Sequence, residues 1–387
     1  MSLHDNDLTL TTPAKPETGV PEMAEVGSAT YQRAGQWRLA WWKFKRHKLA
    51  VVGGIVVLLV YFVAAFAEFL APQDAAAYSA RYTYAPPQRL HFWDEGGFGL
   101  FVNGYRTEIN KESFAREFVI DPEQKIPVGL FVKGAPYKLW GFIPSDIHLI
   151  GPLDPSQPMY LWGADRLGRD MLSRVIHGTR ISMTIGLVGV GLSLFFGILL
   201  GGLSGYYGGQ VDNIIQRVIE FLLAIPTIPL WMGLAAAIPP SLSPVQVYFM
   251  ITVILSLIGW TGLARVIRGR FMAIKNEDFV VAARLDGASE MGIMLRHMAP
   301  SFASHIIASV TLAIPVMILS ETALSFLGIG LRPPVVSWGV LLQEAQNIRS
   351  VATAPWLLLP GIAVIVTVLA LNFLGDGLRD AADPYSE

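Results

Sequence analysis

The residues that could carry out covalent chemistry are few and scattered along the chain. There is no cysteine, there are seven histidines, and no His-Glu-x-x-His, Gly-x-Ser-x-Gly or Gly-x-x-x-x-Gly-Lys-Ser/Thr motif occurs. Disulfides and thiolate metal sites are therefore excluded, and the motifs of zinc hydrolases, serine hydrolases and ATP-binding loops are missing. We expect no catalytic residue, no metal site and no cofactor in this chain.

One charged cluster is dense enough to be considered as a site. Asp165, Arg169 and Asp170 lie within six residues of one another. Two carboxylates beside a guanidinium could hold a metal ion or transfer a proton. A capped amphipathic helix lying at a membrane interface accounts for the same residues, and we prefer that interpretation.

The apolar residues occur in blocks long enough to cross a bilayer. Hydrophobic residues make up 52% of the 387-residue chain and charged residues 15%, which is unusual for a soluble domain. A bilayer core requires roughly 20 apolar helical residues. Six segments reach this length, at about 49–70, 181–203, 214–238, 245–266, 302–327 and 356–374. We predict an all-α integral membrane protein with six transmembrane helices, and the net charge of -1 gives no reason to expect a nucleic-acid partner.

Basic residues near the ends of the spans predict the orientation, because lysine and arginine in short loops are retained in the cytoplasm. One group precedes the first span, and a second lies between spans four and five. These groups are Arg38, Lys43, Lys45, Arg46 and Lys48, followed by Arg265, Arg268, Arg270, Lys275, Arg284 and Arg296. Both groups lie on one side of the membrane by an even number of crossings. We therefore expect both termini in the cytoplasm.

Changes in composition divide the chain into four parts. Residues 1–32 are rich in Pro, Thr, Glu and Ala, which is typical of a disordered tail. A basic entry and the first span follow at 33–70, and 71–179 is predicted to be an enlarged external segment. Alternating runs at 126–132 and 138–142 indicate strands within it. The core domain is then expected at 180–384.

The cytoplasmic loop at 276–300 predicts a helix, a tight turn and a second helix. Asn276 is a candidate N-cap, and Asp278 places a negative charge in the first turn. Gly287 can end the helix in a left-handed conformation, and Ser289 can cap the next one. An ordinary hairpin would show the same pattern. Ala282 and Ala283 have little side-chain bulk, so another protein could approach the backbone of the first helix closely. The residues that we expect to form this contact site are Asn276, Asp278, Ala282, Ala283, Gly287, Ala288, Ser289 and Pro300.

This loop resembles the cytoplasmic signature of permeases of ATP-binding-cassette (ABC) importers, which reads Glu-Ala-Ala, three residues, Gly, and a distal Leu-Pro. Ala282, Ala283, Gly287 and Pro300 stand at the matching positions. Val281 replaces the glutamate, and alanine precedes the proline. Further matches are GADRLGRDMLSR at 163–174, GYYGG at 205–209 with Asp212, LSFLG at 324–328 after Glu321, PP and SWG within 333–339, and NFLGDGLRD at 372–380.

Together these motifs resemble the second permease of dipeptide, oligopeptide and nickel importers. The resemblance implies a type I ABC importer permease in a bacterial inner membrane, with an enlarged external segment between helices 1 and 2. It also implies a homologous second permease, two cassette ATPase subunits and an external solute-binding protein as partners. Peptides are the expected substrate; nickel, oligosaccharides and opine-like conjugates remain alternatives, and a gradient-driven carrier or channel is a further one.

Some residues within or near the spans have two interpretations. Glu321, with Ser325 one turn later, could line the translocation path or form a structural hydrogen bond. Glu220 is expected to be structural. Trp338 and Trp356 are predicted to be anchors at the membrane interface.

Overall fold

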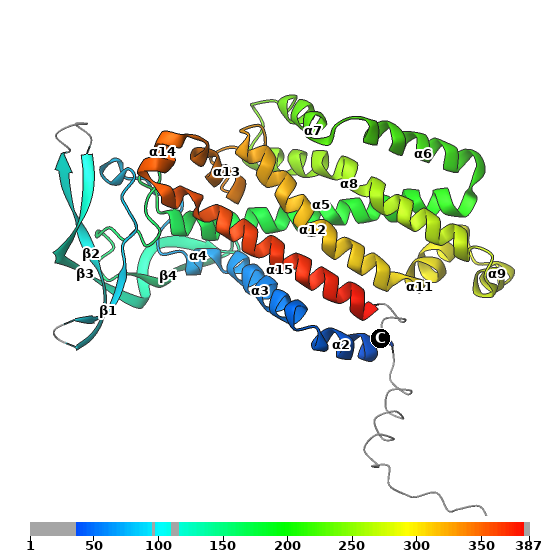
Figure 1. Ribbon diagram of the computed structural model, residues 1–387, viewed down its shortest axis with the longest axis horizontal. Coiled ribbons are helices and arrows are strands. Elements are labelled where there is room, and N and C mark those ends of the chain that lie inside the picture. The colour runs from blue at the N-terminus through cyan, green and yellow to red at the C-terminus, as the bar shows by residue number, and fades with distance from the viewer. Residues whose placement is uncertain (1–35, 95–96, 110–115, 383–387) are drawn as a thin grey trace, which may run out of the picture.

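The molecule is elongated, with a helical bundle that continues into a β-sheet at one end (Figure 1). It is a computed structural model that describes residues 36–94, 97–109 and 116–382. The predicted tail at 1–32 lies outside the described residues.

Long apolar helices form the bundle. Five of them in the described chain are long enough to cross a membrane, namely α3 (Lys48–Ala65), α5 (Met171–Tyr207), α8 (Pro244–Ile274), α12 (Ala303–Phe326) and α15 (Leu359–Ala382). A sixth span is formed if the bent pair α6 (Gly209–Ala224) and α7 (Thr227–Ala236) is counted as one. The prediction of a mainly helical membrane protein is confirmed.

The third predicted span is broken rather than continuous. Helices α6 and α7 are bent by 87° from one another, and Ile225 between them has an extended backbone with ψ of 129°. Pro226 follows, and a residue before proline is disfavoured in the helical region. Proline also lacks the N–H that would continue the helix. The sequence therefore places the break at this dipeptide.

Helix α5 begins earlier than predicted. Asp170 caps it by accepting a hydrogen bond from the Ser173 backbone N–H at 2.8 Å. The predicted interfacial helix around Asp170 is thus the first turn of α5 itself, not a separate element. The boundary predicted at residue 180 falls inside this helix for the same reason.

Glycines let the bundle helices approach closely. A Cβ built on Gly201 of α5 would lie 2.5 Å from the Ala264 carbonyl oxygen of α8, and one on Gly205 would lie 2.7 Å from that of Arg268. Small residues spaced by four along a helix allow such backbone contact between membrane helices. Helices α5 and α8 are thereby held together along the centre of the bundle.

Four antiparallel strands form the sheet, in the order β1-β2-β3-β4. They are β1 (Leu90–Asp94), β2 (Gly97–Ile109), β3 (Arg116–Leu139) and β4 (Ile143–Pro152). The long strand β3 pairs with β2 through its first half and with β4 through its second. The predicted strand at 126–132 lies within β3, but the one at 138–142 is wrong, because its last three residues form the β3–β4 turn.

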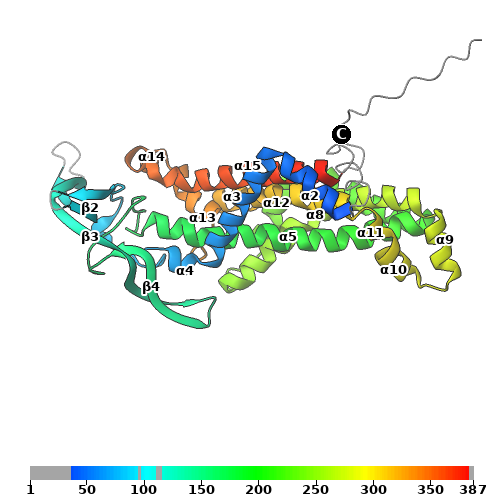
Figure 2. The same cartoon turned by 90° about the horizontal axis from the view of Figure 1, so that it is seen from below.

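The sheet is attached to the bundle through α4 (Ala67–Leu70) and the chain after it. The buried His148 of β4 places Nδ1 2.7 Å from the Ala71 carbonyl oxygen, and the Gln73 N–H donates to Ser173 Oγ at 3.0 Å. A small core of Val102, Ile126, Val128 and Met159 lies beneath the strands. Figure 2 shows the β3–β4 hairpin projecting past α4.

Short elements complete the described chain. They are α2 (Gln36–Arg46), η1 (Ala80–Tyr82), α9 (Asp278–Leu285), α10 (Glu290–Gly292), a π-helical turn η2 (Ile293–Met298), α11 (Ala299–Ser301), α13 (Trp338–Gln343), η3 (Glu344–Gln346), α14 (Ile348–Thr353) and η4 (Pro355–Leu358).

Candidate functional site

The loop from α8 to α12 lies at the end of the molecule opposite the sheet, where α9 and α11 are seen in Figure 1. Helix α9 is followed by a turn, and α10, η2 and α11 then lead directly into α12. The predicted order of helix, turn and helix is therefore present. Both ends of the loop continue into bundle helices.

A small apolar core holds the loop against the bundle. Val280 of α9 is fully buried, and Ala283 is 7% exposed. They belong to one cluster with Ile267 and Phe271 of α8 and Met298 of η2. Because these contacts join α9 to both neighbouring segments, the loop is packed as one unit with the end of α8.

The turn after α9 has the hydrogen bonds of a Schellman motif. Gly287 has φ of +79°, the Ala288 N–H donates to the Ala283 carbonyl oxygen at 3.1 Å, and the Gly287 N–H donates to that of Arg284 at 3.1 Å. Glycine adopts this left-handed conformation without a steric cost. Ser289 then accepts a hydrogen bond from the Gly292 N–H at 3.2 Å and caps α10.

The outer side of the loop exposes several large apolar side chains in the isolated chain. Leu285 is 83% exposed, and Phe279, Met291 and Leu295 are each more than 40% exposed. Ala282 is exposed on the same helix. Large apolar side chains gathered on a loop indicate a protein interaction surface. The sequence pattern points to the two alanines and does not single out these four residues. The signal that could have found them is large apolar side chains in a loop that is expected to be polar.

Polar contacts tie the loop end of the bundle together. Arg268 of α8 forms a two-point ion pair with Asp212 of α6, with N–O distances of 2.5 and 2.6 Å. Asp212 Oδ1 also accepts from Ser204 Oγ at 2.5 Å. Glu290 accepts a hydrogen bond from the Tyr207 hydroxyl. These bonds join α5, α6, α8 and α10.

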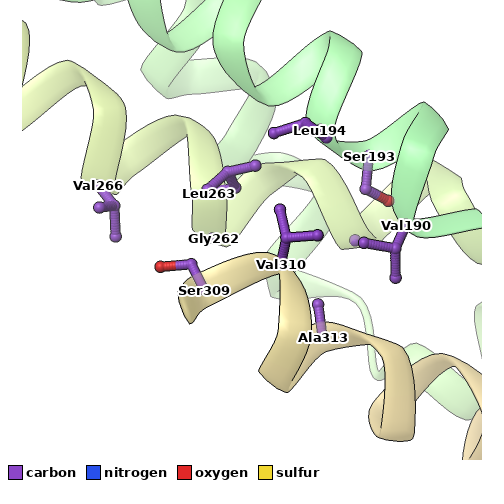
Figure 3. A pocket seen from close by; sticks show the side chains of 10 residues that line it. Val190, Ser193, Leu194, Gly262, Leu263, Val266, Ser309, Val310 and Ala313 are labelled. Carbon is purple, nitrogen blue, oxygen red and sulfur yellow. The ribbon is translucent and has the colours of Figure 1, made fainter. Parts of the chain in front are cut away.

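A recess lies in the middle of the bundle between α5, α8 and α12 (Figure 3). Its volume is ≈ 170 Å³. Ser193 of α5 is 4% exposed, and its hydroxyl has no hydrogen-bond partner among the described residues. The remaining lining is apolar apart from Ser309, and it consists of Val190, Leu194, Gly259, Gly262, Leu263, Val266, Val310 and Ala313. No pattern in the sequence predicts this recess.

Glu321 and Ser325 do not line this recess. Both are fully buried near the sheet-side end of α12, and Glu321 Oε1 accepts hydrogen bonds from Ser325 and Ser337 at 2.7 Å each. In this conformation neither side chain faces an open passage. The interpretation of these residues as lining a translocation path is therefore not supported by their position.

Comparisons with known proteins agree with this architecture. Residues 197–385 match the family described as binding-protein-dependent transport system inner membrane component, and 35–87 match the N-terminal TM domain of oligopeptide transport permease C. A dipeptide transport system permease of Haemophilus influenzae is 32% identical over 345 residues, which cover 89% of this chain and 93% of the relative. The chain belongs to the family of dipeptide and oligopeptide ABC-transporter permeases.

Other members of this permease family are similar over the same length. A di/tripeptide permease of Pseudomonas aeruginosa is 31% identical across 89% of this chain and 90% of its own. A glutathione permease of Pectobacterium atrosepticum is 32% identical across 90% and 91%. The inward-facing MetNI methionine ABC transporter covers 55% of this chain and 98% of its own, with 16% identity and a TM-score of 0.43. The family match and the sequence relatives show that the chain is a multi-pass inner-membrane permease subunit of an ABC importer.

Two predicted details of the permease's loop are wrong. Asn276 does not cap α9, since Glu277 occupies the N-cap position and makes no side-chain bond to the helix. Ala283 is buried, so that only Ala282 of the alanine pair is open to a partner. Asp278, Ser289 and Pro300 are exposed, and Ala288 is half-buried.

The prediction that Trp338 is an anchor at the membrane interface is also wrong. Trp338 is 1% exposed and donates its indole N–H to the Val175 carbonyl oxygen of α5 at 3.2 Å. The half-buried Trp356 donates to Ala164 at 2.8 Å. Both rings therefore join segments within the permease. Glu220 forms an exposed ion pair with Arg217 at 3.0 Å.

The charged cluster before α5 has a structural role. Asp165 is fully buried and forms ion pairs with Arg169, at 2.7 Å, and with Arg174. Burial raises the pKa of Asp170 to about 6, although its hydrogen bonds with Ser173 act in the opposite direction. The described residues contain no group of three or more His, Cys, Asp or Glu side chains that could hold a metal ion. The cluster fixes the entry to α5.

Proposed function

We propose that this permease pairs with a homologous second permease to form the passage of a peptide importer. In this proposal, the movement of two separate cassette ATPase subunits is transmitted to the permease through the loop at 276–300. The observation that carries the proposal is the exposed apolar side of a loop whose other side is packed into the bundle. Leu285, at 83% exposure, is the most open large side chain on it.

The packing of the loop supports a mechanical role. Helix α9 packs through Val280 and Ala283 against the end of α8, and α11 continues into α12. A force applied to the outer side of the loop would therefore move α8 and α12 together, in the way that rigid elements move in domain rotations. The recess lies between these same two helices and α5. Movement at the loop would change its width.

The positions of α2 and of the sheet support the proposed orientation of the permease in the membrane. Helix α2, with Lys43, Lys45 and Arg46 in its last turn, lies at the end of α3 that points away from the sheet in Figure 1, on the side toward α9. The sheet lies at the opposite end. Basic residues are retained in the cytoplasm, so this end and both termini are proposed to be cytoplasmic. The sheet end would then face an external solute-binding protein.

Peptides are the proposed substrate, because the compared relatives are permeases for dipeptides, di/tripeptides and glutathione. Uptake by a strain that lacks this permease would be measured with panels of peptides, oligosaccharides and nickel. Loss of uptake confined to peptides is expected. Retained peptide uptake with loss of another substrate would contradict the assignment.

Gly287 provides a test of coupling that does not touch the membrane spans. A Cβ at this position would meet nothing within 4 Å, so a substitution acts only through the backbone. Gly287→Val places a β-branched residue at φ of +79°, where it is strained. We expect transport per assembled complex to fall at least about tenfold, which corresponds to about 1.4 kcal/mol of coupling free energy.

Gly287→Asn is the matched control, because asparagine tolerates the left-handed region better than other non-glycine residues. It should retain most of the transport. Both variants would be purified with their partners and reconstituted in vesicles, where transport and ATP hydrolysis stimulated by the binding protein are measured together. Wild-type values of both quantities in Gly287→Val would show that the loop does not couple the subunits.

A further inference from the structure

The turn between β3 and β4 presents a tryptophan in a conformation that tryptophan rarely adopts. Trp140 has φ of +53° and Gly141 has φ of +85°, and the Phe142 N–H donates to the Leu139 carbonyl oxygen at 3.2 Å. A β-turn with positive φ angles at both central residues favours Asn, Asp or Gly at those positions. A bulky residue there is strained, which is a reason to look for a function of its side chain.

Trp140 reaches back to the end of a membrane helix. Its indole N–H donates a 2.8 Å hydrogen bond to the carbonyl oxygen of Ala65, the last residue of α3. The last carbonyls of a helix have no partner within the helix. The bond therefore places the hairpin tip at the level where this candidate span ends, and Figure 2 shows the hairpin passing beside α4.

A continuous row of aromatic rings connects the tip to the outer face of α3. Ring centroids are separated by 4.8 Å between Phe62 and Phe66, 5.6 Å between Phe66 and Trp140, and 6.1 Å between Trp140 and Phe142. Phe62 and Trp140 are each 50% exposed, and Phe142 is 69% exposed. The row thus begins on the span and ends on the hairpin.

The face on which the row begins is apolar and open. Leu58 is 70% exposed and Leu59 is 57% exposed, on the same helix as Phe62. Among the five continuous candidate spans of the described chain, α3 is the least buried by the rest of the permease. An open apolar face on a candidate membrane span is suited to contact with lipid. The row extends this apolar surface onto the hairpin.

We propose that the β3–β4 tip is an interfacial anchor that inserts into the membrane leaflet on the sheet side. Tryptophan is enriched at membrane interfaces because its ring is apolar and its N–H is polar. Trp140 and Phe142 supply the apolar surface, and the exposed Lys138 beside them is suited to lipid phosphates. The anchor fixes the sheet relative to the bilayer, so that a partner above the membrane meets it in one orientation.

The absence of cysteine from the chain makes the test direct. Phe142→Cys would be labelled with an environment-sensitive fluorophore in the assembled importer, in nanodiscs of phosphatidylethanolamine and phosphatidylglycerol. Phe98→Cys is the matched control, an aromatic residue of similar exposure, 71%, at the start of β2. Lipids that carry a nitroxide at a shallow acyl position should quench the label at 142 at least threefold more than the label at 98.

Equal quenching at the two positions would overturn the proposal. Quenching at 142 that occurs in the isolated permease and disappears on assembly would overturn it too, since it would assign the tip to a contact with another subunit. Adding Trp140→Asn to the labelled Phe142→Cys chain keeps a residue that tolerates the turn but removes the ring. Quenching should then fall at least twofold, and an unchanged value would show that Trp140 does not anchor the hairpin.

Discussion

At the scale of single residues, one carboxylate oxygen of Glu321 joins separate segments of the bundle. Its two serine donors are themselves acceptors: Ser325 Oγ accepts from the Leu331 N–H at 3.0 Å, and Ser337 Oγ accepts from the Val340 N–H at 3.2 Å. The second of these bonds caps α13. The network thus fixes the chain that returns from α12 toward α13, and we propose a structural role for Glu321.

Substitution of Glu321 should separate the structural role from a role in transport. Glu321→Ala leaves two buried hydroxyls without an acceptor, at about 1–3 kcal/mol each, so the yield of assembled importer and its unfolding temperature should fall. Glu321→Gln keeps an oxygen acceptor and should stay close to the wild type in both. A Gln variant that assembles normally but has lost transport would restore the translocation-path interpretation.

At the scale of elements, the most extensive contact between two helices of the described chain is between α5 and α8. The glycines at 201 and 205 bring the backbones of the two helices together, whereas Gly191, three turns earlier on α5, has nothing within 4 Å of a built Cβ. Backbone atoms of a packed helix cannot move aside as a flexible side chain can. The same substitution should therefore have different effects at positions on the same helix.

Gly201→Ala should destabilise the permease, and Gly191→Ala should not. Overpacking typically costs about 1–3 kcal/mol, because the added methyl group would force α8 away from α5. Thermal unfolding of the purified importer in one detergent would compare the two variants. An equal effect of both substitutions would show that helix propensity, rather than the α5–α8 contact, determines the result.

At the scale of the whole molecule, the two ends have different chemistry. One carries the exposed apolar side chains of the loop around α9, while the other carries the sheet and the ion pairs of Asp165. The bundle separates them by the length of α5, which spans 37 residues and exceeds the roughly 20 that a bilayer requires. Helix α5 therefore extends beyond the membrane.

Single cysteines test the proposed orientation without a fusion partner. Glu123→Cys in the sheet and Asn276→Cys in the loop are both exposed. An impermeant maleimide added to intact spheroplasts should label position 123 and leave position 276 unlabelled, and inverted vesicles should show the opposite. Labelling of position 276 from outside would contradict the proposed topology, because the two groups of basic residues would then lie outside the cytoplasm.

The sequence by itself determined the properties that depend on neighbours along the chain. Apolar blocks give the positions of the spans, and Gly287 gives the turn that ends α9. The break at Pro226 was not predicted, because the apolar block continues across it. Hydropathy and backbone preference are local, since they depend on a residue and a few residues beside it. The order of the family motifs is likewise a property of the chain.

Only the tertiary structure decided which side chains are covered and which are open. Trp338 is interior because Val175, distant in sequence, accepts its indole hydrogen bond, and Trp140 lies at the end of α3 because β3 turns back toward the bundle. The exposed side of α9 followed from the burial of Val280 beneath it. Each of these positions depends on contacts between residues far apart in the chain, which no local pattern of residues contains.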